Sequence, residues 1–164
     1  MSNSDIDPRS YVFAIDPGVN GAWAVFDWGG TPVGCGELPR FDKLLNAVEL
    51  GKLFCGYAPK TLVIEKVGAM PGQGVSSMFT FGCAFGVCLG VAGGAGVPVV
   101  LVTPNAWKKH FRLIGKPKDA ARELAIRLFP RMSHNLNLKK HGGRADALLL
   151  GKYAFDLDNG AKHP

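Results

Sequence analysis

The feature that most constrains this chain is a long stretch without charge. From Val67 to Trp107 the sequence contains no Asp, Glu, Lys or Arg, and Met78 to Val102 is almost entirely apolar. A run of about 20 apolar residues is long enough to cross a bilayer. However, Gly93 to Pro98 would break a helix, and the remaining Met78 to Ala92 would rise only roughly 22 Å at ~1.5 Å per residue. We therefore predict a buried helix followed by a buried strand, with no membrane contact.

Length and composition place the chain among ordinary globular domains. Its 164 residues suit one core, and 47% hydrophobic with 20% charged residues argues against disorder. The formal net charge of +6 weakly favours a polyanionic partner. The four cysteines follow no zinc-binding spacing, and the polar segment 1–10 is no signal peptide. We expect a single domain over residues 1–164, a disordered tail over residues 1–10, and a cytoplasmic location.

The strand pattern predicts an α/β fold with a mixed five-stranded sheet flanked by helices. Three β-rich runs separated by turn residues indicate an antiparallel meander, over Tyr11–Ile15, Ala22–Phe26 and Val33–Leu38. Thr61–Ile64 and Pro98–Val102 are continuous apolar runs, typical of strands that are buried on both faces. The order of strands and helices matches that of ribonuclease-H-like folds.

The helices are predicted from apolar periodicity and capping residues. They are expected over Lys43–Phe54, Met78–Ala92, Asn105–His110, Lys118–Phe129 and Arg144–Phe155. Asp42 is the expected cap of the first helix. The second helix carries Gly82, Gly86 and Gly90 on one face, at a cost in helix propensity of up to ~1 kcal/mol each. We therefore expect that the sheet or a second subunit approaches this face closely.

Three acidic residues stand beside strongly apolar segments. Asp16 follows the first strand, Glu65 ends the fourth, and Asp146 lies in the first turn of the last predicted helix. Acids are rarely placed beside a core unless their charge is compensated, and three converging carboxylates raise one another's pKa. Mg²⁺, with Mn²⁺ as a substitute, prefers oxygen ligands of this kind. Two such ions about 3.5–4 Å apart can activate a water and stabilise the leaving oxygen in phosphodiester cleavage.

Each acid also has an ordinary structural interpretation. Asp16 begins a good turn sequence, and Glu65 can be the solvated end of a strand. Asp146 can complement a helix N-terminus, where acids are favoured by ~0.3–1 kcal/mol. Taken one at a time these interpretations are the better ones. The joint placement of the three, together with the resemblance below, favours a metal-dependent nuclease.

Three short motifs carry a resemblance to a known family. Ala14–Gly18, Val63–Val67 and Arg144–Leu148 resemble, in this order, the three acidic motifs of RuvC-type Holliday-junction resolvases. The match extends from about Val12 to Tyr153. Within this family, the loop Met70–Gly74 and the glycine-striped helix are most similar to the phage-encoded branch.

The resemblance implies a fold, an activity and a set of site residues. It implies a ribonuclease-H-like homodimer, in a bacterial cell or a phage-infected bacterium, that uses Mg²⁺ to cut four-way DNA junctions by paired symmetric incisions. It also implies that Asp16 bridges two metal ions, while Glu65 and Asp146 each hold one.

The sequence departs from the bacterial pattern at Gly143. Bacterial members carry Asp or His three residues before the last acid, where this chain has Gly143, and His141 is the nearest candidate for that fourth catalytic group. The alternative is that His141 is a basic loop residue facing phosphate. Bacterial members also have a junction-wedging Phe near the position of Gly68. The candidates for this role here are Met70, Phe79 and Phe81.

Two clusters of lysines are candidate DNA contacts. The first follows the fifth strand and the second precedes the last acid; together they comprise Lys108, Lys109, Lys116, Lys118, Lys139 and Lys140. Such clusters hold backbone phosphates without reading sequence, and the resemblance places family lysines near Lys108 and Lys118. The alternative is a solvated helix surface. Trp107, between the strand and the first cluster, is expected in the core rather than as a base-stacking platform.

Three other functions are alternatives to a junction-resolving Mg²⁺ endodeoxyribonuclease. An actin-like or sugar-kinase ATPase needs two domains, and Gly68–Ser76 lacks the ending of a P-loop, so no nucleotide cofactor is expected. A protein that binds branched DNA without cutting it would explain the charge but not the three acids. A related nuclease acting on flap, branched or RNA–DNA hybrid substrates shares the same site chemistry and stays open.

Overall fold

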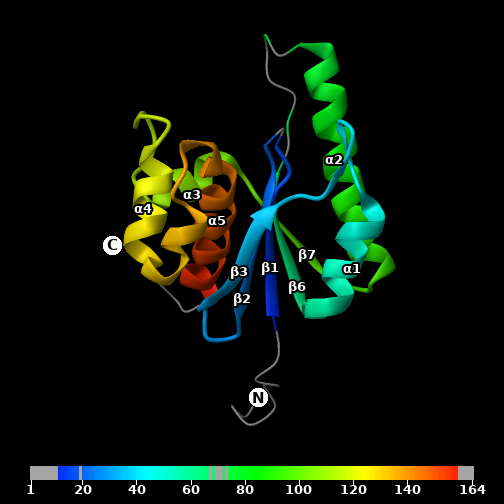
Figure 1. The fold of residues 1–164 in the computed structure, drawn as a ribbon, viewed down its shortest axis with the longest axis horizontal. Coiled ribbons are helices and arrows are strands. Elements are labelled where there is room, and N and C mark those ends of the chain that lie inside the picture. The colour runs from blue at the N-terminus through cyan, green and yellow to red at the C-terminus, as the bar shows by residue number, and fades with distance from the viewer. Residues whose placement is uncertain (1–10, 19, 67, 69–71, 73, 159–164) are drawn as a thin grey trace.

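A five-stranded mixed sheet organises the chain (Figure 1). The computed structural model describes residues 11–18, 20–66, 68, 72 and 74–158; the expected tail 1–10 and the wedge candidate Met70 lie outside these residues. The sheet has the order β3-β2-β1-β6-β7, in which β1 is antiparallel to β2 and parallel to β6. Its strands are β1 (Tyr11–Asp16), β2 (Ala22–Asp27), β3 (Pro32–Glu37), β6 (Thr61–Glu65) and β7 (Val99–Val102). The predicted fold class is confirmed.

Helices cover both faces of the sheet (Figure 1). One face packs against α3 (Pro104–His110), α4 (Ala120–Leu128) and α5 (Gly142–Asp158), and the other against α1 (Ala47–Tyr57) and α2 (Val75–Gly94). Two short 3-10 helices, η1 (Pro130–Asn135) and η2 (Lys139–His141), connect α4 to α5.

Side chains of the central strand β1 alternate between the two cores. Val12 and Ala14 pack under α5, whereas Phe13 and Ile15 pack under α1 and α2. The central strands therefore have few polar side chains except at their ends. This alternation decides on which face a residue at the end of a strand lies.

The first helix begins later than predicted. Asp42 does not cap it, but lies at a φ of 54° in the turn of a small hairpin formed by β4 (Arg40–Phe41) and β5 (Leu44–Leu45). The helix begins at Ala47, where the side chain of Asn46 accepts hydrogen bonds from two backbone N–H groups. The prediction was wrong because Asp42 and Asn46 are both good caps, and a pair of leucines between them fits either a strand or a helix.

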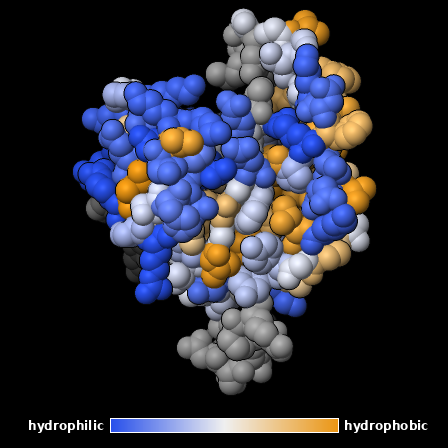
Figure 2. Space-filling model, viewed as in Figure 1, coloured by the Kyte–Doolittle hydropathy of each residue, from blue (hydrophilic) through white to orange (hydrophobic). Residues whose placement is uncertain are grey.

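The uncharged segment is not buried as we predicted. Helix α2 has 20 residues, of which only Ala84, Cys88 and Ala92 are buried, and β7 is an edge strand with Val100 46% and Leu101 50% exposed. Figure 2 shows apolar residues gathered along α2. Hydrophobicity indicates that a surface avoids water, but not that the same chain covers it.

The length argument against a membrane span is also wrong. Within the described part of the chain, α2 is the one helix that is long and apolar enough to cross a membrane by length and composition. A single helix of this kind is by itself weak evidence for a membrane span. Its buried stripe belongs to the core that contains Phe13 and Ile15, so one side of α2 is fixed to the sheet.

The expected close contact of the glycine stripe is not made by the sheet. Gly82, Gly86 and Gly90 lie on the exposed side of α2. A Cβ atom at any of the three would meet no described atom within 4 Å. Of the two neighbours that we considered, the sheet is therefore excluded and a second subunit remains.

Candidate active site

The carboxyl ends of β1 and β6 bring two of the predicted acids together. Asp16 is the last residue of β1 and Glu65 the last residue of β6. Ala14 pairs with Val63 across these parallel strands, and both side chains belong to the core under α5. Because side chains alternate along a strand, Asp16 and Glu65 lie on this same face, two residues further along.

The third acid reaches the site from α5. This helix begins at Gly142, two residues earlier than predicted, so Asp146 is its fifth residue and lies beyond the first turn. The stabilisation of an acid by a helix N-terminus falls off within the first turn. The structure therefore weakens the interpretation that Asp146 only complements a helix N-terminus.

Glycines allow α5 to lie directly on the strands and on the loop that follows Asp16. A Cβ at Gly151 would lie 2.2 Å from a ring carbon of Phe26, and a Cβ at Gly143 would lie 2.2 Å from the carbonyl oxygen of Asn20. Both distances are far inside van der Waals contact. The position at which bacterial resolvases carry a fourth ligand is therefore closed to any side chain in this backbone arrangement.

The three carboxylates influence one another electrostatically. Burial raises the pKa of Asp16 to about 6, with a further contribution from the charge of Glu65. Burial raises the pKa of Asp146 to about 7, and the charges of Asp16 and Glu65 add to the effect. The N–H of Gly18 donates to Oδ1 of Asp16 at 3.0 Å and opposes part of this rise. A cluster of acids with raised pKa values is a site that a cation would stabilise.

Glu65 is held by a tryptophan. Nε1 of Trp107 donates to Oε1 of Glu65 at 2.8 Å, and Trp107 is 1% exposed. Trp107 belongs to α3, whose first turn is capped by the hydroxyl of Thr103. The core location predicted for Trp107 is confirmed, but its hydrogen bond to Glu65 was missed. The only signal in the sequence was that a buried indole N–H needs an acceptor.

Two of the predicted lysines act directly on the acids. The charge of Lys108 lowers the pKa of both Asp16 and Asp146, and that of Lys118 lowers the pKa of Asp146. Nζ of Lys108 also lies 5.2 Å from the centroid of the Trp107 ring. The other four lysines, Lys109, Lys116, Lys139 and Lys140, are exposed on the surface.

The structure does not bring His141 into the group of acids. It is 7% exposed, and its Nδ1 accepts a hydrogen bond from the N–H of Leu138 at 3.4 Å. Burial lowers its pKa, and the charges that act on it come from Arg144, Lys140, Glu37 and Arg122. A lowered pKa favours the neutral imidazole with its proton on Nε2. Its catalytic role remains a prediction.

The three acids offer oxygen donors of the kind that a hard divalent cation prefers. Across residues 11–18, 20–66, 68, 72 and 74–158, no three His, Cys, Asp or Glu side chains are close enough to cage a metal ion by themselves. Mg²⁺ usually binds through one or two carboxylates and takes its other ligands from water and substrate phosphates. Asp16, Glu65 and Asp146 offer only hard oxygen donors, at the point where buried negative charge accumulates.

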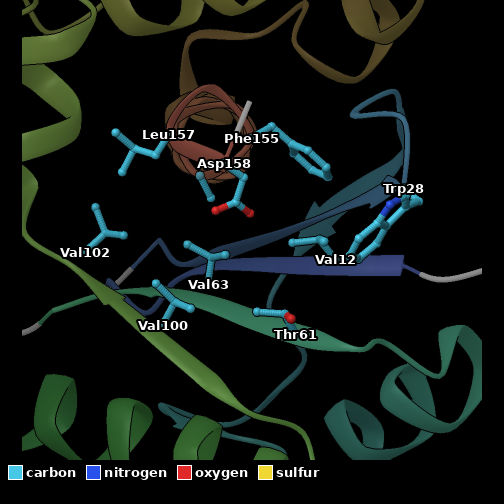
Figure 3. A pocket seen from close by; sticks show the side chains of 10 residues that line it. Val12, Trp28, Thr61, Val63, Val100, Val102, Phe155, Leu157 and Asp158 are labelled. Atoms are coloured by element: carbon cyan, nitrogen blue, oxygen red, sulfur yellow. The ribbon is translucent and has the colours of Figure 1, made fainter. Parts of the chain in front are cut away.

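An apolar cavity of about 310 Å³ lies between the last turns of α5 and the sheet (Figure 3). Val12 and Thr61, near the beginnings of β1 and β6, form part of its wall, and Asp158 points into it. None of the three clustered acids lines it. We assign it no role in catalysis.

The sheet order, with helices on both faces, is similar to the fold of RuvC-type resolvases. RuvC of Thermus thermophilus, in complex with a Holliday junction substrate, matches with a TM-score of 0.61 and 20% identity, over 92% of this chain and 96% of that one. The yeast mitochondrial Holliday junction resolvase Ydc2 matches with a TM-score of 0.60 and 12% identity, over 96% of this chain and 86% of that one.

A sequence relative points to the same class of protein. The chain is 38% identical over 93 residues to the chloroplastic Holliday junction resolvase MOC1 of Chlamydomonas reinhardtii. This segment is 56% of this chain and 10% of that protein, so the match spans about a tenth of its relative. No protein-family model matches the sequence.

Proposed function

We propose that the protein is a structure-selective, metal-dependent endodeoxyribonuclease that resolves four-way DNA junctions. The observation that carries the proposal is the group of partly buried acids at the carboxyl edge of the sheet, where the pKa values of Asp16 and Asp146 are raised to about 6 and about 7. The RuvC-like fold and the sequence similarity to a junction resolvase support it. The place of action would be the cytoplasm of a bacterial cell, or of one infected by a phage.

The proposed cofactor is Mg²⁺, with Mn²⁺ as a substitute and two ions in each site. Asp16 would bridge the ions, and Glu65 and Asp146 would each hold one. The ions would supply an activated water and stabilise the leaving oxygen. The protein's part is to hold three carboxylates on one face of the sheet, with one oxygen of Glu65 fixed by Trp107. Binding of the ions would displace the protons that the raised pKa values retain near neutral pH.

The proposed DNA contacts are the lysines around the acids. Lys108 and Lys118 lie near enough to act on Asp146, so they would hold phosphates next to the cut. Alanine substitutions of five lysines should weaken junction binding, and removing each true phosphate contact should reduce the log–log salt slope by about one. The positions are Lys108, Lys109, Lys118, Lys139 and Lys140. Fluorescence anisotropy in Ca²⁺ measures this, and an unchanged slope would place the DNA elsewhere.

We propose that two copies pair through α2. Its exposed side is apolar, and three glycines at intervals of four residues leave room for a second helix to approach closely. Lipid tails would not require such room, which favours a second copy over a membrane. Two active sites related by a two-fold axis would account for paired, symmetric incisions.

A junction-cleavage assay tests the proposed function. A synthetic four-way junction, a duplex, a flap and an RNA–DNA hybrid are incubated with Mg²⁺ or with EDTA. Paired cuts in the junction that require Mg²⁺ are expected. Faster cutting of the flap or hybrid would favour the related nuclease instead, and tight junction binding without cutting would favour a non-cutting DNA-binding protein.

A further inference from the structure

A fourth carboxylate lies in line with the acids but outside their group. Asp16 pairs with Ala22 across β1 and β2, and Ala22 pairs with Glu37 across β2 and β3. Directly paired residues share a face of the sheet, so Glu37 lies on the face of Asp16, two strands or roughly 10 Å away. Its side chain is 61% exposed and accepts a hydrogen bond from Nη2 of Arg144 at 3.2 Å. The charge of Glu37 is thus balanced without a metal.

A polar cleft opens beside Glu37. Its volume is about 480 Å³, and it is lined by Asn20, Gly21, Glu37, Leu38, Arg40 and Lys140. These residues come from the β1–β2 loop, from the end of β3 with the segment that follows it, and from η2. The volume is within the roughly 300–1,000 Å³ that is usual for small-ligand sites.

Part of the wall of the cleft is the loop that follows Asp16. A Cβ at Gly21 would lie 2.7 Å from the backbone oxygen of Asp16, so the loop turns back tightly on itself. Nη2 of Arg40 donates to the carbonyl oxygen of Gly18 at 2.9 Å. The backbone of Asn20 packs against Gly143 at the beginning of α5. Asp16, Glu65 and Asp146 do not line the cleft, but its wall is continuous with the loop that follows Asp16, so a ligand there would lie beside the group of acids rather than within it.

The chemistry of the lining suits a nucleotide better than a simple anion. Arg40 and Lys140 can neutralise a phosphate, whereas the carboxylate of Glu37 would oppose a small anion that filled the cleft. A carboxylate accepts a hydrogen bond from the amino group of cytosine, and an asparagine amide can pair with adenine. Glu37 and Asn20 thus offer groups for a base edge, while Arg40 and Lys140 offer groups for the backbone.

The cleft also lies on the opposite side of the acids from Lys108. Lys108 belongs to α3, which follows the edge strand β7, whereas the cleft is at the end of the other edge strand, β3. Along the carboxyl edge of the sheet, cations thus flank the acids in both directions, toward β7 and toward β3. A DNA strand that crosses the carboxyl edge of the sheet from β7 to β3 would pass Lys108, the acids and then the cleft.

We propose that this cleft holds a nucleotide adjacent to the scissile phosphate and reads its base through Asn20 and Glu37. The inference rests on the proposed function and extends it from the shape of the DNA to its sequence. It makes Asn20 and Glu37 specificity-determining residues, and Arg40 and Lys140 phosphate contacts at the same nucleotide.

The test is a cleavage assay on a library of four-way junctions in which every base is varied around the cut, read by sequencing the products. The wild-type protein is expected to prefer particular bases at a flanking position. Asn20→Ala and Glu37→Gln should each reduce that preference, by roughly 5- to 150-fold when a good base contact is removed. Preferences at the other positions should remain. Glu37→Gln keeps an acceptor oxygen for Arg144 but replaces the second carboxylate oxygen with an NH2 donor, which cannot accept from a base. The melting temperature reports whether each variant folds.

Glu49→Gln is the matched control, because Glu49 is an exposed acid of α1 that pairs with Lys52 away from the cleft. It should leave every preference unchanged. Lys140→Ala, at an exposed position, tests the phosphate contact independently and should reduce the salt slope of binding by about one without altering the preference.

The outcomes separate the two proposals. If the wild-type protein cuts no junction, the proposed function fails. If it cuts junctions without any base preference, or if folded Asn20→Ala and Glu37→Gln retain the wild-type preference at every position, the proposed function stands and the reading of a base by this cleft is wrong.

Discussion

Helices α5 and α2 both carry several glycines, but the two sets have opposite surroundings. A Cβ at Gly143 or Gly151 of α5 would lie 2.2 Å from another part of the chain. A Cβ at Gly82, Gly86 or Gly90 of α2 would have no neighbour within 4 Å among the residues described. Glycine in a helix has a cost in propensity. In α5 close packing within the chain offsets it, whereas in α2 no described part of the chain does so, and this side of the helix is open to another molecule.

The two helices also differ in the side chains that they present. Helix α5 carries Asp146 on the face of the sheet where the charges of Asp16 and Glu65 raise its pKa, and α3 with Lys108 and Trp107 lies on the same face. Helix α2 contributes no charged side chain, and its apolar surface is visible along its length in Figure 2. We infer that the face of α5 serves chemistry and that the face of α2 serves assembly.

The largest effects should follow changes at the acids. Asp16→Asn, Glu65→Gln and Asp146→Asn should each lower the rate of junction cutting by more than ~10³-fold, because bound metal ions contribute several kcal/mol to transition-state stabilisation. Junction affinity in Ca²⁺ should remain close to that of the wild type. Single-turnover cleavage and fluorescence anisotropy measure the two quantities. Cutting by any one variant at near the wild-type rate would remove that residue from the site.

A pair of glycine substitutions should separate the two helices. Gly151→Leu should lower the free energy of unfolding by at least ~1–3 kcal/mol, because the new side chain would overlap the ring of Phe26. At Gly86 a side chain would meet no described atom of the same chain, so Gly86→Leu should leave the fold intact. It should instead obstruct the proposed contact with a second copy and shift the protein toward the monomer. Denaturant unfolding and light scattering measure these effects.

The conservative variant Gly86→Ala sharpens this comparison. In a monomer it should stabilise α2 by up to ~1 kcal/mol through helix propensity. In a closely packed dimer the added methyl group should weaken association instead. An unchanged mass for Gly86→Leu, together with a simple gain of stability for Gly86→Ala, would show that no second copy packs there.

A moderate effect on metal binding is expected from Trp107→Phe. The change keeps an aromatic ring but removes the N–H that holds Oε1 of Glu65, and loss of such a partner typically weakens metal affinity about tenfold or more. Titration calorimetry with Mn²⁺ measures the affinity without cleavage. Trp28→Phe is the control, because Trp28 is 44% exposed in the β2–β3 turn. Equal affinities for the two variants would mean that the hydrogen bond has no role at the metal site.

A further effect should be on stability without metal. Asp16 and Asp146 have pKa values raised from 3.8 to about 6 and about 7, so in this range the folded protein retains protons that the unfolded chain releases. In EDTA the free energy of unfolding should therefore fall as pH rises from about 4 to about 7. Asp146→Asn should flatten this slope, and saturating Mg²⁺ should counteract it. A slope that is the same in Asp146→Asn would show that Asp146 is not buried as described.

The sequence was sufficient for those parts of the fold that local pattern determines. Strands β1, β2 and β6 are predicted by short apolar runs between turn residues, and the runs that precede Asp16 and Glu65 place both acids at strand ends. The pairing of β1 with β6 then brings the acids together. The motifs therefore located the candidate site without any knowledge of tertiary contacts.

The sequence was insufficient for features that depend on contacts between distant segments. Nothing local shows that Trp107 donates to Glu65, 42 positions away in the chain. The alternation that puts Glu37 in line with Asp16 depends on the register of three strands. The apolarity of α2 and β7 was read as burial, because hydrophobicity alone does not distinguish a core from a surface that a partner covers.

The contact between Asn20 and Gly143 joins the loop of Asp16 to the helix of Asp146 through backbone atoms alone. The separation of these two acids therefore does not depend on the rotamer of any intervening side chain. A metal ion that arrives or leaves should therefore move these two carboxylate-bearing segments little relative to each other. For the same reason, a side chain at position 143 requires the backbone at Asn20 to move. A fourth ligand introduced at Gly143 would require the loop to be rebuilt in the same step.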